Sequence, residues 1–410
     1  MSILLGTTGD RVLDSRPDVD LIDGDFYADE LHAACAWMRE YEPIYHDRKN
    51  DLYAATRHAD IMEISKNSAV FRNGQGFRPD SGVLPMMISM DRPEHMMRRG
   101  LVNRGFTPRR VAAYEGRVRE ICSQIIDAVA ERGSCDFVRD IAAPLPLIVI
   151  GDLLGVEAKD HDRLLRWSDD LMNGLGSNDP DKMAAQGRAG LEYREYCSTV
   201  VEDRRSRPPA EDLMSILVHA ELDGERLANE SIFMESLLIL IGGDETTRHV
   251  ISGGMQQLLL HPDQARALQA DPTRIPTAVE EMLRWVTPIQ NMMRTVSEEV
   301  TVGSHTFEEG DRVLLMYPSG NRDEHVFDRP FEFDSTRDPN PHIAFGGYGA
   351  HFCLGSSLAR LELRVMFEEL MRRIPDMTLA SETHPPIRPA NFVVGIEQLP
   401  VRFTPVSVPG

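Results

Sequence analysis

The sequence has little of what a secreted, membrane-bound or nucleic-acid-binding protein needs. Its five cysteines are odd in number, scattered and without a CxxC pair, so we expect neither a disulfide framework nor a zinc site. The first ten residues hold too few apolar positions for a signal peptide or anchor, which predicts a cytoplasmic protein without a membrane span. Acidic residues outnumber basic ones to a formal net charge of -21, which argues against nucleic acid as a partner.

No linker, repeat or low-complexity segment divides the 410 residues, so we expect a single large domain over 1–410. Helical periodicity dominates residues 95–290 and 354–373. Strand patterns concentrate in 40–80, 296–320 and 388–405, where 391–394 and 400–403 look like a last pair of strands. The expected fold class is therefore mostly α with small β-sheets.

The most informative segment surrounds Cys353. It places Gly346, Gly347, Gly349 and Gly355 around one thiol, directly before an amphipathic helical run that starts at Ser356. Glycines allow a tight backbone that approaches a bulky group closely. A thiol just ahead of a helix is biased towards thiolate by the helix dipole and the unpaired amides. Thiolate-bound haem iron is one chemistry that needs such a socket.

The segment resembles the haem-ligand loop of cytochromes P450, whose usual pattern is Phe-x-x-Gly-x-x-x-Cys-x-Gly. Phe345 lies eight residues before Cys353 instead of seven, and with Gly346-Gly347 this is similar to bacterial members that oxidise terminal methyl groups of steroids and branched lipids. The resemblance implies the cytochrome P450 fold and a haem b whose iron is bound by Cys353. It also places Phe345, Gly346, Gly347 and Gly355 beside the cofactor.

A second pattern lies in the middle of a long helix predicted from Glu230 to His261, with Asn229 as its N-cap. Taken alone, Thr246 could bond back to the carbonyl of Gly242 while the glycines admit a neighbouring helix. The run Gly243-Asp244-Glu245-Thr246 also matches the family's Gly-x-Asp/Glu-Thr signature. The resemblance then implies that Glu245 and Thr246 relay protons to bound dioxygen, that Asp244 assists, and that Gly242 borders the haem.

Charged residues complete the resemblance. Glu281 and Arg284 lie at i,i+3, a pair that is more often a solvated surface pair but that in the family buttresses the cysteine loop from about 70 residues upstream. We expect Arg337 as the third member of this network. The family's clamps on the haem propionates correspond to His95, Arg99, Arg294 and His351, each of which could otherwise be a surface charge.

The chain contains no reductase domain, so electrons must come from another protein. Its one basic stretch contains Arg92, Arg98, Arg99, Arg104, Arg109 and Arg110. We expect an acidic ferredoxin to dock there, supplied by a ferredoxin reductase from NAD(P)H. The alternative is that these arginines pair with the protein's own carboxylates.

The similarity extends over nearly the entire chain and is closest to hydroxylases of the terminal (26/27) side-chain methyl of cholesterol and cholest-4-en-3-one, which implies a role in cholesterol catabolism. Candidate pocket walls, each of which could instead be core, are Val83, Leu84, Met87, Leu240, Gly243, Ile289, Gln290 and Phe392, with Phe77 and Arg78 at the mouth. Another lipid substrate, such as a branched fatty acid or terpenoid, is an alternative. A cysteine hydrolase using Cys353 with His351, or a non-catalytic haem carrier, is the alternative from another class.

Overall fold

The computed structural model describes residues 13–175, 179–222, 224–381 and 385–407; the N-terminal ten residues on which we based the absence of a signal peptide lie outside them. The helices and strands confirm a mostly α fold with small sheets. The α-helices are α1 (Leu31–Tyr41), α2 (His58–Lys66), α3 (Glu94–Val102), α4 (Pro108–Ala113), α5 (Glu115–Ala130), α6 (Pro144–Leu154), α7 (His161–Gly174), α8 (Pro180–Ser206), α9 (Leu213–His219), α10 (Asn229–Leu260), α11 (Pro262–Ala270), α12 (Ile275–Val286), α13 (Tyr317–Gly320) and α14 (Ser356–Arg373). The strands are β1 (Ile44–Asp47), β2 (Leu52–Ala55), β3 (Phe71–Arg72), β4 (Ser134–Asp136), β5 (Glu221–Leu222), β6 (Glu225–Arg226), β7 (Asn291–Val296), β8 (Val300–Val302), β9 (His305–Phe307), β10 (Arg312–Met316), β11 (Thr378–Leu379) and β12 (Pro400–Arg402).

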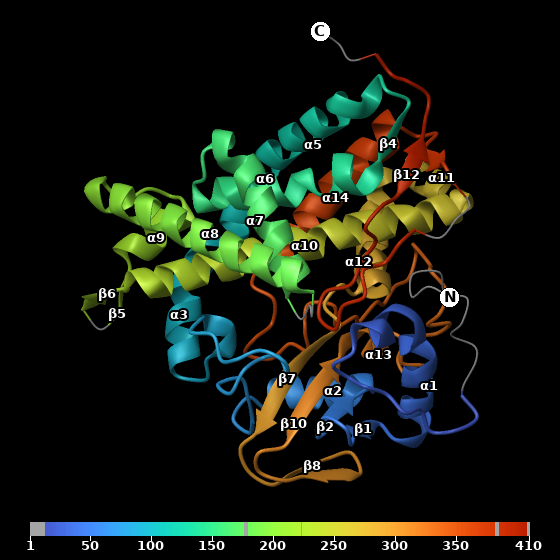
Figure 1. The fold of residues 1–410 in the computed structure, drawn as a ribbon. Coiled ribbons are helices and arrows are strands. Elements are labelled where there is room, and N and C mark those ends of the chain that lie inside the picture. Colours follow the sequence, from blue (N-terminus) through green and yellow to red (C-terminus); the bar gives the residue numbers. More distant parts are fainter. Residues whose placement is uncertain (1–12, 176–178, 223, 382–384, 408–410) are drawn as a thin grey trace.

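The molecule has a helical part and a smaller strand-rich part (Figure 1). In Figure 1, α10 runs across the helical part, with α5, α6 and α14 on one side of it and the sheet that contains β7 and β10 on the other. That sheet has the order β1-β2-β10-β7-β3, and β2 and β10 are its parallel pair. Among the described residues, no helix combines the length and the apolar character that crossing a bilayer requires.

Helix α10 is the axis on which the site is built. It spans Asn229–Leu260, and the residue that caps it is Ala228, so the expected N-cap role of Asn229 is wrong. Two of its glycines bring neighbours close: a Cβ on Gly253 would lie 2.7 Å from Val286, and one on Gly254 would lie 2.8 Å from Met282. Small residues at these positions therefore let α12 pack directly against α10.

The C-terminal segment differs from the expected pair of strands. Residues 400–402 form β12, which pairs with β4 and β11, but 391–394 contribute only one bridge, between Val393 and Ile289. The Asn391 side chain explains this, because its amide donates to Ile22 O and to Asp80 and holds the segment as a loop. This loop crosses towards β7 and carries Phe392 into the interior.

Candidate active site

The loop before α14 wraps back on itself at Cys353. The Cys353 amide donates to the carbonyl oxygen of Phe345 at 3.0 Å, so the longer spacing still returns Phe345 to the thiol. Gly346 has φ 93° and Tyr348 has φ 56°, and these two turns of left-handed backbone accommodate the extra residue of the loop. A Cβ on Gly347 or Gly349 would collide with Ser65 of α2. These glycines therefore serve both the turn and a close contact with α2.

Opposing effects act on the pKa of the Cys353 thiol. Burial raises its pKa above the ordinary value, while backbone amides of Gly355 and Ser356 and the charges of Arg99 and Arg360 act in the opposite direction. Burial is the larger effect on this pKa, while the amides at the start of α14 act in the direction that the sequence predicts. A bound metal ion deprotonates a coordinating thiol outright, and this socket fits a thiol that ionises on binding metal.

The four expected propionate clamps come together from three parts of the chain. The His95 and His351 rings stack with centroids 3.9 Å apart, and Arg99 Nη2 donates to Phe352 O at 2.5 Å. Burial and the nearby arginines lower the pKa of His95 to about 4 and that of His351 to about 2, so both rings are neutral. Buried His95 Nδ1 has no hydrogen-bond partner. This cationic, incompletely paired cluster fits the carboxylates of a haem.

The two glycines of α10 have different surroundings. Gly242 is exposed although it lies in the middle of the helix, and a Cβ there would have nothing within 4 Å. Gly243 instead faces α6, where a Cβ would collide with Ile150. The Thr246 hydroxyl donates to Gly242 O at 2.8 Å, as the back-bonding alternative predicted. Gly242 and Thr246 therefore face the open side of α10, where a flat cofactor fits, and Gly243 serves helix packing.

Glu245 is fully buried and surrounded by cations. It forms ion pairs with Arg248, with His249 at 3.1 Å and with Arg388 of the C-terminal segment at 2.9 Å. Burial opposes ionisation, but these partners hold its pKa well below the usual range. Neighbouring Asp244 is equally buried, and burial raises its pKa to about 7. Sequence reasoning missed both Arg388, which is remote from Glu245 in the chain, and His249, whose i,i+4 spacing on α10 could have indicated the pair.

Glu281, Arg284 and Arg337 form one buried cluster below the cysteine loop. Arg284 donates from Nε and Nη2 to Glu281 at 2.7 Å each, and Arg337 Nε donates to the same carboxylate at 3.1 Å. Arg337 thus occupies the third position, while the Glu332 side chain pairs outward with Arg329. Arg284 also donates to Asn321 O, which ties the cluster to the loop after α13.

An additional ion pair, missed from the sequence, links α12 to α14. Arg360 donates to Glu280 at 2.6 and 2.8 Å, and His342 lies 2.9 Å from the same carboxylate. Burial opposes its ionisation, yet Arg360 and His342 lower the pKa of Glu280 to about 2. The Arg360 guanidinium also lies over the Phe345 ring, 4.6 Å from its centroid, so this pair braces the ligand loop directly.

The predicted pocket walls fall into separate groups. Leu84, Ile289 and Phe392 share one apolar cluster with Phe77, Met172 and Val393, and the Gln290 amide donates to Phe392 O at 2.8 Å. Met87 and Leu240 belong to the main core instead, and Val83 is 57% exposed. Ile241 and Met172 belong to or pack against the apolar cluster and were missed, because hydrophobicity alone does not distinguish a pocket wall from core.

The basic stretch is not uniformly exposed. Arg92, Arg104 and Arg109 are exposed, and Arg110 donates to Glu211 O at 2.9 Å. Arg98 is only 8% exposed and faces Glu235 of α10, so its inclusion in the surface that we expected a ferredoxin to contact is wrong. Its position on α3, one residue before Arg99, rotates it to the opposite side of the helix from solvent.

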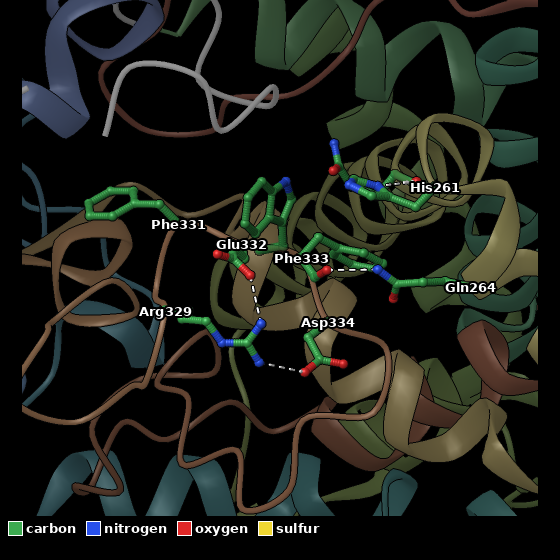
Figure 2. A pocket seen from close by; sticks show the side chains of 9 residues that line it. His261, Gln264, Arg329, Phe331, Glu332, Phe333 and Asp334 are labelled. Carbon is green, nitrogen blue, oxygen red and sulfur yellow. Dashed lines mark hydrogen bonds and ion pairs between the residues drawn. The ribbon is translucent and has the colours of Figure 1, made fainter. Parts of the chain in front are cut away.

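A surface pocket elsewhere carries no residue of this site (Figure 2). It lies between the end of α10, α11, α12 and the segment 329–334. Its polar side chains are engaged with one another: Arg329 pairs with Glu332 at 2.7 Å and with Asp334 at 3.6 Å, and Gln264 donates to Phe333 O (Figure 2). We assign it no part in the chemistry.

The fold and the convergence of Cys353, the clamps and the open face of α10 define a haem-thiolate enzyme. The model of the cytochrome P450 family matches residues 175–403. A steroid C26-monooxygenase of Mycolicibacterium smegmatis is 50% identical over 394 residues, covering 95% of this chain and 97% of the relative. A methyl-branched lipid omega-hydroxylase of Mycobacterium tuberculosis is 37% identical, covering 87% and 83%.

Solved structures of cytochromes P450 have the same fold as this chain. A Mycobacterium marinum cytochrome P450 in complex with pseudoionone superimposes with a TM-score of 0.87 at 33% identity, covering 95% of this chain and all of that one. A Bacillus megaterium relative in complex with corticosterone gives 0.81 at 31% identity, covering 90% and 96%. This chain belongs to the cytochrome P450 family and is a monooxygenase that uses haem and dioxygen. A cysteine hydrolase is thereby excluded.

Proposed function

We propose that this cytochrome P450 hydroxylates the terminal side-chain methyl of cholesterol or cholest-4-en-3-one. One observation carries the proposal: relatives named steroid C26-monooxygenase are 48–50% identical over 90–95% of the chain. The apolar cluster of Phe77, Met172, Phe392 and Val393 supports it, because these side chains come together from separate segments and Ile241 of α10 packs against them.

The chain's own residues have distinct roles in this proposal. Cys353 is the iron ligand, and the bound haem supplies the activation of dioxygen that inserts oxygen into an unactivated C–H bond. His95, Arg99, Arg294 and His351 hold the propionates. Thr246, whose hydroxyl already lies on the open face of α10, would supply a proton on the side of the helix that faces the haem, and its neighbour Glu245 is kept anionic by Arg248, His249 and Arg388. The apolar cluster orients the guest and excludes water.

The monooxygenase reaction needs electrons from a redox donor. We assign their supply to a ferredoxin and ferredoxin reductase that use NAD(P)H. The exposed arginines 92, 104 and 109 lie on the segments next to α3, whose Arg99 touches the loop of Cys353 through Phe352 O. An acidic donor fits this cationic surface.

Spectroscopy of the haem-loaded protein tests the proposal. The wild type is expected to give the reduced carbon-monoxide band of a thiolate-bound haem, and Cys353→Ala is expected to lose it. Cholest-4-en-3-one is expected to shift the iron spin state and to yield the terminal alcohol with a ferredoxin system. Retention of the thiolate band in Cys353→Ala would contradict the ligand assignment.

A second lipid substrate class is tested in the same series. Relatives at 37–38% identity are named methyl-branched lipid omega-hydroxylase, so branched fatty acids belong in the panel. We expect tighter binding and faster turnover of the sterol ketone than of any fatty acid. The reverse order would transfer the proposal to the lipid. A thiolate band without turnover of any guest would instead indicate a haem carrier.

A further inference from the structure

Glu235 and Arg98 form a buried ionic site between α10 and α3. Glu235 lies on α10 and is fully buried, and Arg98 of α3 is only 8% exposed. Their closest approach, from Arg98 Nε to Glu235 Oε1, is 3.9 Å. Within the described part of the chain, Arg98 Nε and Nη1 and Glu235 Oε2 have no hydrogen-bond partner. A buried charged pair that is this loosely paired is costly, so packing alone does not account for its presence.

The only backbone group that Glu235 binds belongs, within the described residues, to the segment between β3 and α3. The Met87 amide donates to Glu235 Oε1 at 3.0 Å. The ends of that segment are clipped together, because Asp91 accepts from the amides of Asn73 at 2.8 Å and Gly74 at 3.1 Å. The hydrogen bond between Met87 and Glu235 therefore attaches this segment to α10.

The segment carries part of the apolar cluster that we assign to the substrate. Leu84 and Ile88, on either side of Met87 in the chain, pack against that cluster of Phe77, Met172, Phe392 and Val393. Ile88 is also held by its carbonyl, which accepts from Asn73 Nδ2 at 3.0 Å. A shift of Met87 relative to α10 would also move Leu84 and Ile88 relative to Gly242 and Thr246, which lie on α10.

We propose that Glu235, supported by Arg98, is a positioning residue that anchors segment 73–91 to α10 and thereby sets where the substrate lies. This inference rests on the proposed function only in naming the sterol guest. The anchor requires the anionic form of Glu235, because a carboxylate accepts the Met87 N–H bond more strongly than a neutral acid does.

The charge state of Glu235 gives the anchor a pH signature. Burial raises its pKa to about 7, Arg98 and the Met87 amide act to lower it, and Glu94 acts to raise it. The folded pKa lies above the value of an unfolded chain, so Glu235 takes up a proton as pH falls through about 7. Guest binding is therefore expected to weaken as pH falls from 8 to 6, roughly fivefold if one charge-assisted bond is replaced by a neutral one.

The test compares Glu235→Gln with Glu230→Gln in haem-loaded protein. Glu230 is on the same helix but is exposed and paired with Arg194, so its variant controls for loss of a charge on α10. Hydrogen–deuterium exchange without any substrate is expected to show faster exchange at Met87 in Glu235→Gln and unchanged exchange in the control. Equal protection of Met87 in both variants would overturn the anchor.

The spin-state titration with cholest-4-en-3-one supplies the second readout. The affinity of wild type for the sterol is expected to change in one step near pH 7. Glu235→Gln is expected to bind the sterol at every pH with the weaker affinity that wild type shows at low pH. In Arg98→Met the step is expected to move to higher pH, because the cation that favours the carboxylate is gone. A step that persists in Glu235→Gln would refute the role of this carboxyl. Absence of any sterol shift in wild type would defeat the proposed substrate, while the exchange experiment still decides the anchor.

Discussion

Two buried glutamate–arginine sites of the molecule differ in how completely they are paired. Glu281 accepts five hydrogen bonds, from Arg284 twice, from Arg337, from Asn340 and from the Asp334 amide. Glu235 accepts one, from Met87, and its arginine lies 3.9 Å away. A saturated cluster fixes the loop that carries Cys353 in one geometry, whereas the loosely paired site suits a segment that must accommodate guests. Saturation of buried charges thus separates the rigid side from the adjustable side.

The largest expected effect is the loss of the saturated cluster. Glu281→Ala leaves Arg284 and Arg337 buried without their carboxylate, which is expected to cost about 3–5 kcal/mol of unfolding free energy. Urea unfolding and haem content of the purified protein measure this, and we expect little haem to be retained. Glu299→Ala, at an exposed position on the β7–β8 connection, is the control, and its change is expected to stay within about 0.5 kcal/mol. Equal stability of the two variants would mean that the cluster is not a buttress.

The rigid side is also the side that sequence predicts best. The spacing of Glu281 and Arg284, and the glycines around Cys353, follow from local geometry and resemblance, and Arg337 was found as the third partner. The adjustable side depends on contacts between distant segments. Nothing in the sequence indicates that Arg388 meets Glu245, that Arg98 turns inward to Glu235, or that Asn391 holds residues 391–394 as a loop.

The pocket residues were also difficult to predict, because their roles depend on the three-dimensional arrangement of the segments. Leu240 and Gly243 are both small or apolar residues of α10, and helical phase decides which residues of that helix face the guest. Ile241 joins the Phe392 cluster, whereas Leu240, one residue earlier on α10, is buried in the main core. An error of one residue on a helix rotates a side chain by about 100°, enough to exchange pocket for core.

The next effect concerns the proton path on the adjustable side. Thr246→Ala removes the hydroxyl on the open face of α10, and we expect hydroxylation to fall on the order of 10²-fold, the lower range for a lost proton-transfer group. Consumed reducing equivalents are expected to appear as peroxide, which is measured beside the product. Thr247→Ala, whose side chain is buried, is the matched control and is expected to remain coupled. Unchanged coupling in Thr246→Ala would assign Thr246 only its bond to Gly242.

The smallest expected effect separates the two glycines of α10. Gly243→Ala places a methyl against Ile150 and is expected to destabilise the fold by about 1–3 kcal/mol through overpacking. Gly242→Ala meets no atom of the chain and is expected to stabilise the protein by about 1 kcal/mol when haem is absent, because alanine favours the helix.

With haem bound, we expect Gly242→Ala to become the more damaging of the two variants. The reason is that the open face of Gly242 is where the cofactor and guest lie in our assignment. Gly242→Ala is then expected to perturb the visible spectrum and weaken guest binding, while Gly243→Ala leaves the spectrum of its folded fraction unchanged. Thermal unfolding of apo and holo protein, followed with the Soret spectrum, measures both. A normal spectrum and guest affinity in Gly242→Ala would show that this face of α10 does not border the haem, and would place the cofactor elsewhere along the helix.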